Sequence, residues 1–534
     1  MSQAIATVTG QQERPIGFLG LMRNRNYALL WWGQLVSELG NRFHWIAVSL
    51  WVYTITRSAA AVSLAVSAMF VGGLLVGLWA GAIVDRLDRR KILIVSDVVR
   101  AVLVAAIPPL MGVHLWLAYA DLALISVATA FFRPAMFAVI PAFVGKRDIL
   151  PANSFFTAMD TGTEILGPAL AGIIAFKYGY ALLLYSDALT YVFSALCLLG
   201  TSVSAMGESR IERPDKQSML NAIAEGFQYI RRDPLQRQLF VLIFPAYLVG
   251  SGLNALATPL AKGVVGITDA DFGTFNSVWG VGFLVASLLV GWFGDRVGKS
   301  ELIIGGFFLG FASSAAMGMS RSLDTLLLTA FAVGFANTLN YVGLSTVILE
   351  RTQQRVIGRV LATRQVALGT IRVLSPLAFG ALGDAIGVRQ SIWTMAAVGT
   401  LGTSAVVAFS PALRRIGSVG PPPGVSKIWK SFVTSANPEF DGNQQIRLNL
   451  GTLLIVALTW LGVALRYPVY SAGLLVAVLG VAYLAVSFKG RLWSALANLV
   501  EHMFRSTRER VGEIRGKHQS EPRPGRDRGK RLNG

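Results

Sequence analysis

The stretch AVSLAVSAMFVGGLLVGLWAGAIVDRLDRRK, residues 61–91, joins an apolar run to a cluster of positive charge. Residues 61–84 carry no charged side chain, and a helix needs only about 20 apolar residues to cross the hydrocarbon core of a bilayer. Arginine and lysine directly after such a run are typical of the cytoplasmic side of a membrane. This stretch therefore predicts a transmembrane helix that ends in the cytoplasm.

The same pattern recurs along the chain of 534 residues, of which 53% are hydrophobic and 14% charged. Soluble domains carry roughly 25% charged residues, so the composition favours an all-α polytopic membrane protein. Twelve apolar runs precede residue 412: 27–54, 61–84, 91–112, 115–141, 151–176, 179–203, 237–260, 272–294, 301–319, 323–349, 357–383 and 388–410. Two further runs, 448–465 and 469–488, bring the predicted number of spans to fourteen.

The distribution of basic residues predicts the orientation in the membrane. With the N-terminus inside, the inner segments hold clusters: Arg14, Arg23, Arg25, Arg86, Arg89, Arg90, Lys91, Lys146, Arg147, Arg210, Arg213, Lys216, Arg231 and Arg232. The outer loops hold mostly single charges: Arg57, Lys177, Lys262, Arg321, Arg389 and Arg466. This bias follows the positive-inside rule. We therefore expect a multi-pass protein of the inner (plasma) membrane with both termini in the cytoplasm.

An internal repeat divides the first twelve spans into two sets of six. Gly81, Asp85, Arg86, Arg89 and Arg90 follow the second span, and Gly291, Asp295, Arg296 and Lys299 follow the eighth. Repeats of this kind are typical of secondary transporters. The predicted parts are a six-helix bundle (1–203), a cytoplasmic loop with an amphipathic helix (204–236), a second six-helix bundle (237–411), a linker (412–447), two extra transmembrane helices (448–488) and a basic cytoplasmic tail (489–534).

The repeated loop resembles the loop 2–3 motif of the major facilitator superfamily. The segments Phe132–Ala135, Leu150–Asn153 and Ser186–Ala188 resemble its enterobactin-exporter-like branch of drug and siderophore exporters. The resemblance covers residues 20–410 and implies two six-helix bundles working by alternating access. It also implies that the loop is a latch for one access state, against the alternative of a plain positive-inside anchor. Fourteen-span members usually carry their extra pair between the halves, so the role of residues 412–534 stays open.

Charged residues within the spans are costly and usually functional. The first span carries Glu38 and Arg42 one turn apart, with His44 nearby, and the fifth carries Asp160 and Glu164. Two carboxylates on one face repel, which favours a shared proton and hence a proton-coupling site. The eleventh span carries the basic pair Arg364 and Arg372. The acidic and arginine residues named here, six without His44, are candidates for the substrate cavity or an ion-pair gate, and the alternative is a buried structural salt bridge.

Other polar residues in the spans have a structural interpretation. Asp97 and Arg100 lie one turn apart in the third span, where they can neutralise each other. Asp121 and Asp187 lie nearer the outer ends of spans four and six, and we assign them no role beyond packing polarity.

Gly167, Pro168 and Gly172 in the fifth span resemble the motif of proton antiporters in the same superfamily. An interior proline bends a helix, and glycine lets a neighbouring helix approach closely. The motif indicates export, with a simple packing kink as the alternative.

The tail 489–534 is rich in lysine and arginine, and Leu492–Ile514 reads as an amphipathic helix. We expect it to bind anionic lipids, where each basic residue contributes about 1 kcal/mol, and not nucleic acid. A clamp that fixes the last span is the alternative.

The sequence thus predicts a proton-coupled exporter of a small amphiphilic molecule such as a drug or siderophore. It predicts a monomer, with the proton gradient in place of a cofactor. The four scattered histidines and the single cysteine favour no metal site, and no catalytic constellation points to an enzyme. Two alternatives remain: a lipid or lysolipid translocase of the same fold, and a transporter-like membrane anchor or sensor for the C-terminal module.

Overall fold

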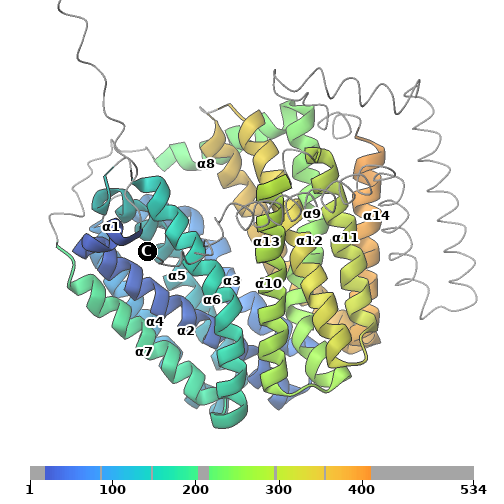
Figure 1. Cartoon of the computed structure of the whole chain (residues 1–534), viewed down its shortest axis with the longest axis horizontal. Helices are drawn as coiled ribbons and strands as arrows, with labels where there is room; N and C mark the ends of the chain where they lie inside the picture. The colour runs from blue at the N-terminus through green and yellow to red at the C-terminus, as the bar shows by residue number, and fades with distance from the viewer. Residues whose placement is uncertain are drawn as a thin grey trace, which may run out of the picture. The chain divides into compact units, whose positions relative to one another are not determined.

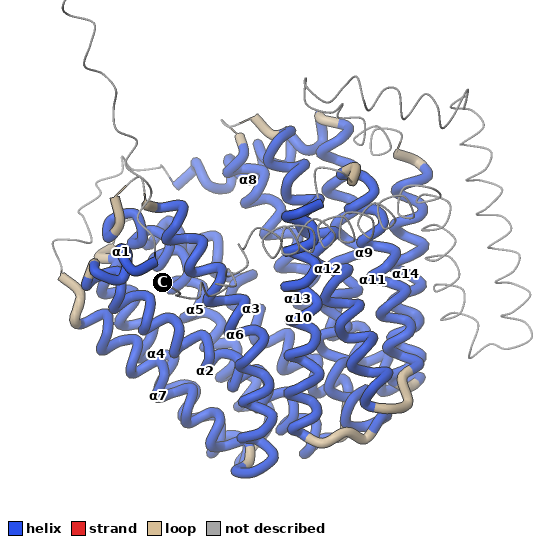
Figure 2. The backbone as a smooth tube through the Cα atoms, viewed as in Figure 1, coloured by secondary structure: helices blue, strands red, loops and turns tan. Residues whose placement is uncertain are grey.

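The computed structural model describes residues 18–84, 87–145, 148–202, 216–293, 297–353 and 356–410. These residues form helices joined by short loops, without a β-strand among them (Figure 2). The helices are α1 (Phe18–Arg23), α2 (Arg25–Thr56), α3 (Ala59–Val84), α4 (Arg89–Val113), α5 (Leu115–Phe143), α6 (Ile149–Tyr178), α7 (Tyr180–Leu199), α8 (Lys216–Arg232), α9 (Pro234–Thr258), η2 (Pro259–Val265), α10 (Asp269–Phe293), α11 (Lys299–Met319), α12 (Leu323–Arg351), α13 (Ile357–Ile386) and α14 (Val388–Ala408).

Helices α2–α7 form a first group, which we call the first half. In it α2 packs along α7, α3 along α5, and α4 along both α5 and α7. Asn24 caps the start of α2 by accepting hydrogen bonds from the backbone N–H groups of Asn26 and Tyr27, at 3.0 and 3.2 Å. Such a side-chain cap satisfies N–H groups that have no partner within the helix. The first half is therefore built from long helices whose ends are closed locally.

Helices α9–α14, with η2, form the second half. Here α10 and α11 pack on α12, and α9 packs on α13 and α14. The π-helical η2 continues α9 beyond Thr258, and Gly266 ends it with a φ of 80°. The helix α8 falls within the loop for which the sequence predicts an amphipathic helix, and its Glu225 forms an ion pair with Arg359 of α13. That pair ties the loop to the second half.

The two halves meet along two helix pairs, α6 with α10 and α3 with α13 (Figure 1). At the first pair, a Cβ on Gly172 would collide with the backbone of Asp269 and Gly273. At the second, a Cβ on Gly380 would collide with the Ser63 side chain. Glycine therefore sets the distance of closest approach at both contacts, as in other tightly packed membrane helices.

Ten helices of the described residues are long and apolar enough to cross a membrane. The twelve-helix arrangement adds α2 and α6, which are the helices that carry Glu38, Arg42, Asp160 and Glu164. The predicted all-α polytopic membrane fold is confirmed. The two extra spans and the tail, 448–488 and 489–534, lie outside the described residues.

Candidate functional site

We call the end of the molecule where α2 ends and α3 begins the Arg57 end. At this end one carboxylate stabilises the contact between α3 and α13. Asp384, near the end of α13, accepts hydrogen bonds from the Ser58 hydroxyl at 2.5 Å and from the backbone N–H groups of Ala59 and Ala60 at 2.6 and 3.2 Å. A carboxylate is stabilised at a helix N-terminus by free N–H groups and by the helix dipole. Asp384 of the second half thus caps a helix of the first half.

A second polar contact joins the halves at the same end. Asp269, at the start of α10, lies 2.6 Å from the Lys262 ammonium of its own half. The Tyr180 hydroxyl of the first half donates to Asp269 at 3.0 Å and lies 3.1 Å from the Thr54 hydroxyl. This contact places a paired carboxylate against a tyrosine from the opposite half.

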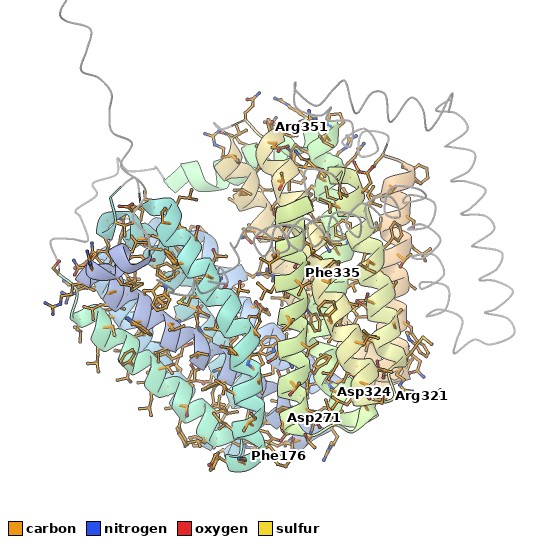
Figure 3. All side chains as sticks on the ribbon, in the orientation of Figure 1. Phe176, Asp271, Arg321, Asp324, Phe335 and Arg351 are labelled. Carbon is orange, nitrogen blue, oxygen red and sulfur yellow. The ribbon has the colours of Figure 1, made fainter. Side chains whose placement is uncertain are left out.

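Contact between the halves continues from the Arg57 end to the middle of the helices. The Ser67 hydroxyl donates to the Val373 carbonyl at 2.8 Å, and Gly280 packs against the backbone of Glu164. In Figure 3, Phe176 and Asp271 mark the Arg57 end at the lower edge, and Arg351 marks the opposite end. We call the end where α1 and α8 lie the Arg25 end. The ribbons of the two halves meet at the lower edge and diverge toward the Arg25 end (Figure 1).

A group of charges lies on α2 and α6 near mid-helix. The Arg42 guanidinium lies 3.0 Å from the Asp160 carboxylate, and their side chains are 27% and 57% exposed. Glu164, one turn along α6, interacts electrostatically with Arg42, Asp160 and Glu38. Three carboxylates and one guanidinium give this cluster a net charge of about −2 when all are ionised. We call these four residues the Arg42 cluster.

Gly167 makes room for this cluster. A Cβ at Gly167 would collide with the Arg42 side chain, so any larger residue would push the guanidinium away from Asp160. The sequence motif that resembles a proton-antiporter signature therefore has a local packing consequence here. Pro168 lies inside α6 in the same turn, and Gly172 sets the α6–α10 approach.

The two arginines of α13 have different surroundings. Arg364 is 8% exposed, and its Nε atom has no hydrogen-bond partner among the residues that the structure describes. Arg372 is exposed and lies over the rings of Phe70 and Tyr247, at 5.8 and 5.7 Å from their centroids. Such cation–π contacts need no acidic partner. The ion pair recorded for Asp160 is with Arg42 of its own half rather than with α13.

The repeated loop motif is described in part. Asp85, Arg86, Asp295 and Arg296 lie outside the described residues. Arg90 donates to the last carbonyls of α7, at 3.2 Å to Leu198 and 2.6 Å to Leu199, and Arg89 donates to Ala138 at 3.4 Å. In the second copy, the Lys299 ammonium lies 2.7 Å from the Glu350 carboxylate.

These contacts place the basic residues of the motif on neighbouring helix ends, where cations are stabilised. Asp88 caps α4 by accepting from the N–H groups of Arg90 and Lys91, at 2.9 and 3.3 Å. Among the described residues, no neighbouring atom lies within 4 Å of a Cβ built on Gly81 or on Gly291. The latch role of the motif stays a prediction.

Asp97 and Arg100 form a buried ion pair on α4. The Arg100 guanidinium is also held between the rings of Phe132 and Tyr191, 4.1 and 4.3 Å from their centroids. A buried charge needs this degree of pairing because its transfer from water is costly. The pair has the surroundings of a structural element rather than of a substrate contact.

Sequence reasoning missed the groups that join the halves at the Arg57 end. Asp384, Asp269 and Tyr180 lie at helix ends, where a polar residue carries no special signal. No group of three or more His, Cys, Asp or Glu side chains in the described part of the chain is placed to hold a metal ion.

Comparison with known proteins identifies the family. The family model of the Major Facilitator Superfamily matches residues 30–263 and 239–506. The chain belongs to this superfamily. It is therefore a multi-pass membrane transporter and not an enzyme.

Several relatives and one solved structure are similar over most of their length. The uncharacterized MFS-type transporter YfiS of Bacillus subtilis is 26% identical over 66% of this chain and 86% of its own. Macrolide efflux protein A of Streptococcus pyogenes is 23% identical over 68% and 90%, and the multidrug efflux pump Tap of Mycolicibacterium fortuitum is 25% identical over 73% and 96%. A bacterial homologue of the human lysosomal transporter Spinster, in an inward-facing and unoccupied conformation, has a TM-score of 0.61 at 14% identity, over 74% of this chain and 98% of its own.

Proposed function

We propose that this transporter exports a small amphiphilic molecule in exchange for protons. The observation that carries the proposal is the Arg42 cluster, which places three acids and one base on α2 and α6, two long helices that are not among the ten apolar enough to count as membrane spans by composition. Charge within a membrane span is costly and is retained where it serves transport. A protein that only anchors a C-terminal module has no need of such a cluster.

The net negative charge of the cluster provides a means of exchange. One arginine compensates one carboxylate, and the remaining negative charge is reduced when a proton or a cationic group of the substrate binds. Because both ligands lower the same charge, each weakens the binding of the other. An exchanger needs this competition because the binding of protons to the cluster releases the bound substrate.

Alternating access requires two states, and the Arg57-end contacts stabilise the one described here. Asp384 and Asp269 hold the halves together at that end, and the helices diverge toward the Arg25 end. The basic residues of the loops support a cytoplasmic position for the Arg25 end in the plasma membrane. In that orientation we expect the Arg42 and Asp160 side chains, which are 27% and 57% exposed, to be accessible from the cytoplasm.

Two further observations support export. The relatives include proteins named for macrolide and multidrug efflux, and Gly167 of the antiporter-like motif packs on Arg42. The lipid or lysolipid translocase remains an outcome of the test below, in which a fluorescent lysolipid is offered beside ethidium and a macrolide.

The test is transport in inside-out vesicles with an imposed pH gradient. Asp160→Asn and Glu164→Gln should abolish gradient-driven accumulation and leave the amount of protein in the membrane unchanged. Asp324→Asn is the matched control because Asp324 is an exposed aspartate at the Arg57 end, remote from the cluster (Figure 3). Full transport in both cluster variants and in the double variant would reject the coupling role.

A further inference from the structure

A second group of titratable side chains lies inside the first half, apart from the Arg42 cluster. The His44 Nδ1 atom of α2 lies 3.1 Å from the Asp187 carboxylate of α7, and the two residues are 8% and 0% exposed. Asp121 of α5 is 5% exposed and lies within electrostatic range of His44. Its Oδ2 atom is buried and has no hydrogen-bond partner in the part of the chain that the structure describes.

A glycine in α2 makes room for the His44–Asp187 contact. A Cβ on Gly40 would collide with the Asp187 carboxylate and with the Thr190 hydroxyl, so the missing side chain lets α2 approach α7 at this level. The Thr190 hydroxyl donates to the Asp187 backbone carbonyl at 2.7 Å and lies 3.3 Å from the Asp187 carboxylate. Asp187 is therefore held by one imidazole and one hydroxyl, and Asp121 has only the imidazole as a charged neighbour.

Charge balance determines how many protons the three groups hold. A buried charge without a partner costs several kcal/mol, so a neutral group is favoured. An imidazolium with two carboxylates has a net charge of −1, and one additional proton on a carboxylate brings it to zero. The step that exchanges a proton with water is the protonation of Asp121, whose Oδ2 atom has no hydrogen-bond partner among the described residues.

The other charged groups on the surrounding helices are already engaged or lie at a distance. On α4, Asp97 pairs with Arg100, and on α2 and α6 the Arg42 cluster compensates itself in part. The helices α3 and α7 carry no other charged residue, and Arg133 of α5 is exposed.

Tyr191 lies between these groups. Its hydroxyl donates to Asn41 at 2.5 Å, and it interacts electrostatically with Asp187, Arg100, Asp97 and Glu38. Tyr191 is therefore an electrostatic neighbour of Asp187 in this group and of Glu38 in the Arg42 cluster.

We propose that His44, Asp187 and Asp121 form a proton-binding site inside the first half, distinct from the Arg42 cluster. The site takes up one proton from water as a carboxylic acid at Asp121 and releases it when the packing of α2, α5 and α7 opens. Its part in transport rests on the proposed proton exchange, but proton binding itself does not.

The test is infrared spectroscopy of the purified full-length chain in lipid nanodiscs, with isotope-labelled aspartate to assign the bands. Between about pH 8 and about pH 5, the wild type should gain a protonated aspartate band. Asp121→Asn should lose that band, and Asp324→Asn should keep it. His44→Gln removes the positive charge, so a protonated aspartate should persist to higher pH than in the wild type.

Several outcomes would overturn the site. A wild type with no protonated aspartate band at about pH 5 would overturn it. An unchanged band in Asp121→Asn, or an unchanged titration of the band in His44→Gln, would also overturn it. Transport that ignores the pH gradient in the wild type would instead reject the proposed exchange. The infrared result would be unaffected by that failure.

Discussion

Asp384 should control the balance between the two access states. The carboxylate accepts three hydrogen bonds from the start of α3, and Asp384→Asn removes its charge while keeping one oxygen acceptor. Anion binding at a helix N-terminus contributes about 0.3–1 kcal/mol at exposed sites, and charged acceptors strengthen hydrogen bonds further. Because Asp384 is exposed, solvent screening reduces the charge effect. We therefore expect a shift of about 1 kcal/mol, which changes the ratio of the two states about fivefold.

The assay is a distance measurement between two spin labels at the Arg57 end. Cysteines replace Lys177 of the first half and Arg321 of the second, both exposed, in a chain whose single cysteine, Cys197, is changed to alanine. Asp384→Asn should increase the population of the longer distance, and Asp384→Ala should increase it more. Asp324→Asn is the control. Identical distance distributions for Asp384→Ala and the parent would refute the reasoning, because the acceptor and its charge are then both absent.

Three other substitutions test separate contacts. Gly172→Leu should force α6 and α10 apart and lengthen the same spin-label distance. Gly73→Leu is the control because a Cβ at that position meets open space, and it should leave the distance unchanged. Equal effects of the two substitutions would contradict the close-approach argument. Lys262→Gln should remove the ion pair of Asp269, and its effect on the spin-label distance should add to that of Asp384→Asn. A Lys262→Gln, Asp384→Asn double variant with the same distance distribution as either single variant would argue against independent contacts. Arg100→Ala should lower the midpoint of thermal unfolding in detergent because loss of one partner of a buried pair costs about 3–5 kcal/mol. An unchanged midpoint would mean that Asp97 is neutral when Arg100 is absent.

The membrane fold could be predicted because each span has a strong local signal. An apolar run of the required length and a basic loop after it are sequence properties, and the 6+6 repeat adds a second indication. Even α2 and α6, whose polar residues weaken the apolar signal, were predicted as spans. The charges that weaken it, Arg42 and Asp160, were also the first candidates for the site.

The partners of those charges could not be predicted. Glu38 lies one turn from Arg42 in the sequence of α2, whereas the structure places Asp160 of α6 against Arg42. The approach of α2 to α6 depends on Gly167, and nothing in the local sequence indicates which helix that glycine faces.

Asp384 illustrates the same limit at the Arg57 end. It lies in a helix terminus, 326 residues after the Ser58 that it binds, and only the packing of α3 on α13 gives it a role. His44, Asp187 and Asp121 likewise come from three separate spans, and their isolated positions in the sequence suggested no common site.

The proton exchange itself is tested most directly by the proton movement that a substrate causes. Purified full-length protein is placed in liposomes with a trapped pH indicator and no imposed pH gradient, and an ethidium or macrolide gradient is applied. Because coupling is reciprocal, the wild type should move protons against the direction of substrate flow, and the Asp160→Asn, Glu164→Gln double variant should not. Substrate movement by the wild type without any proton movement would contradict the proposed exchange.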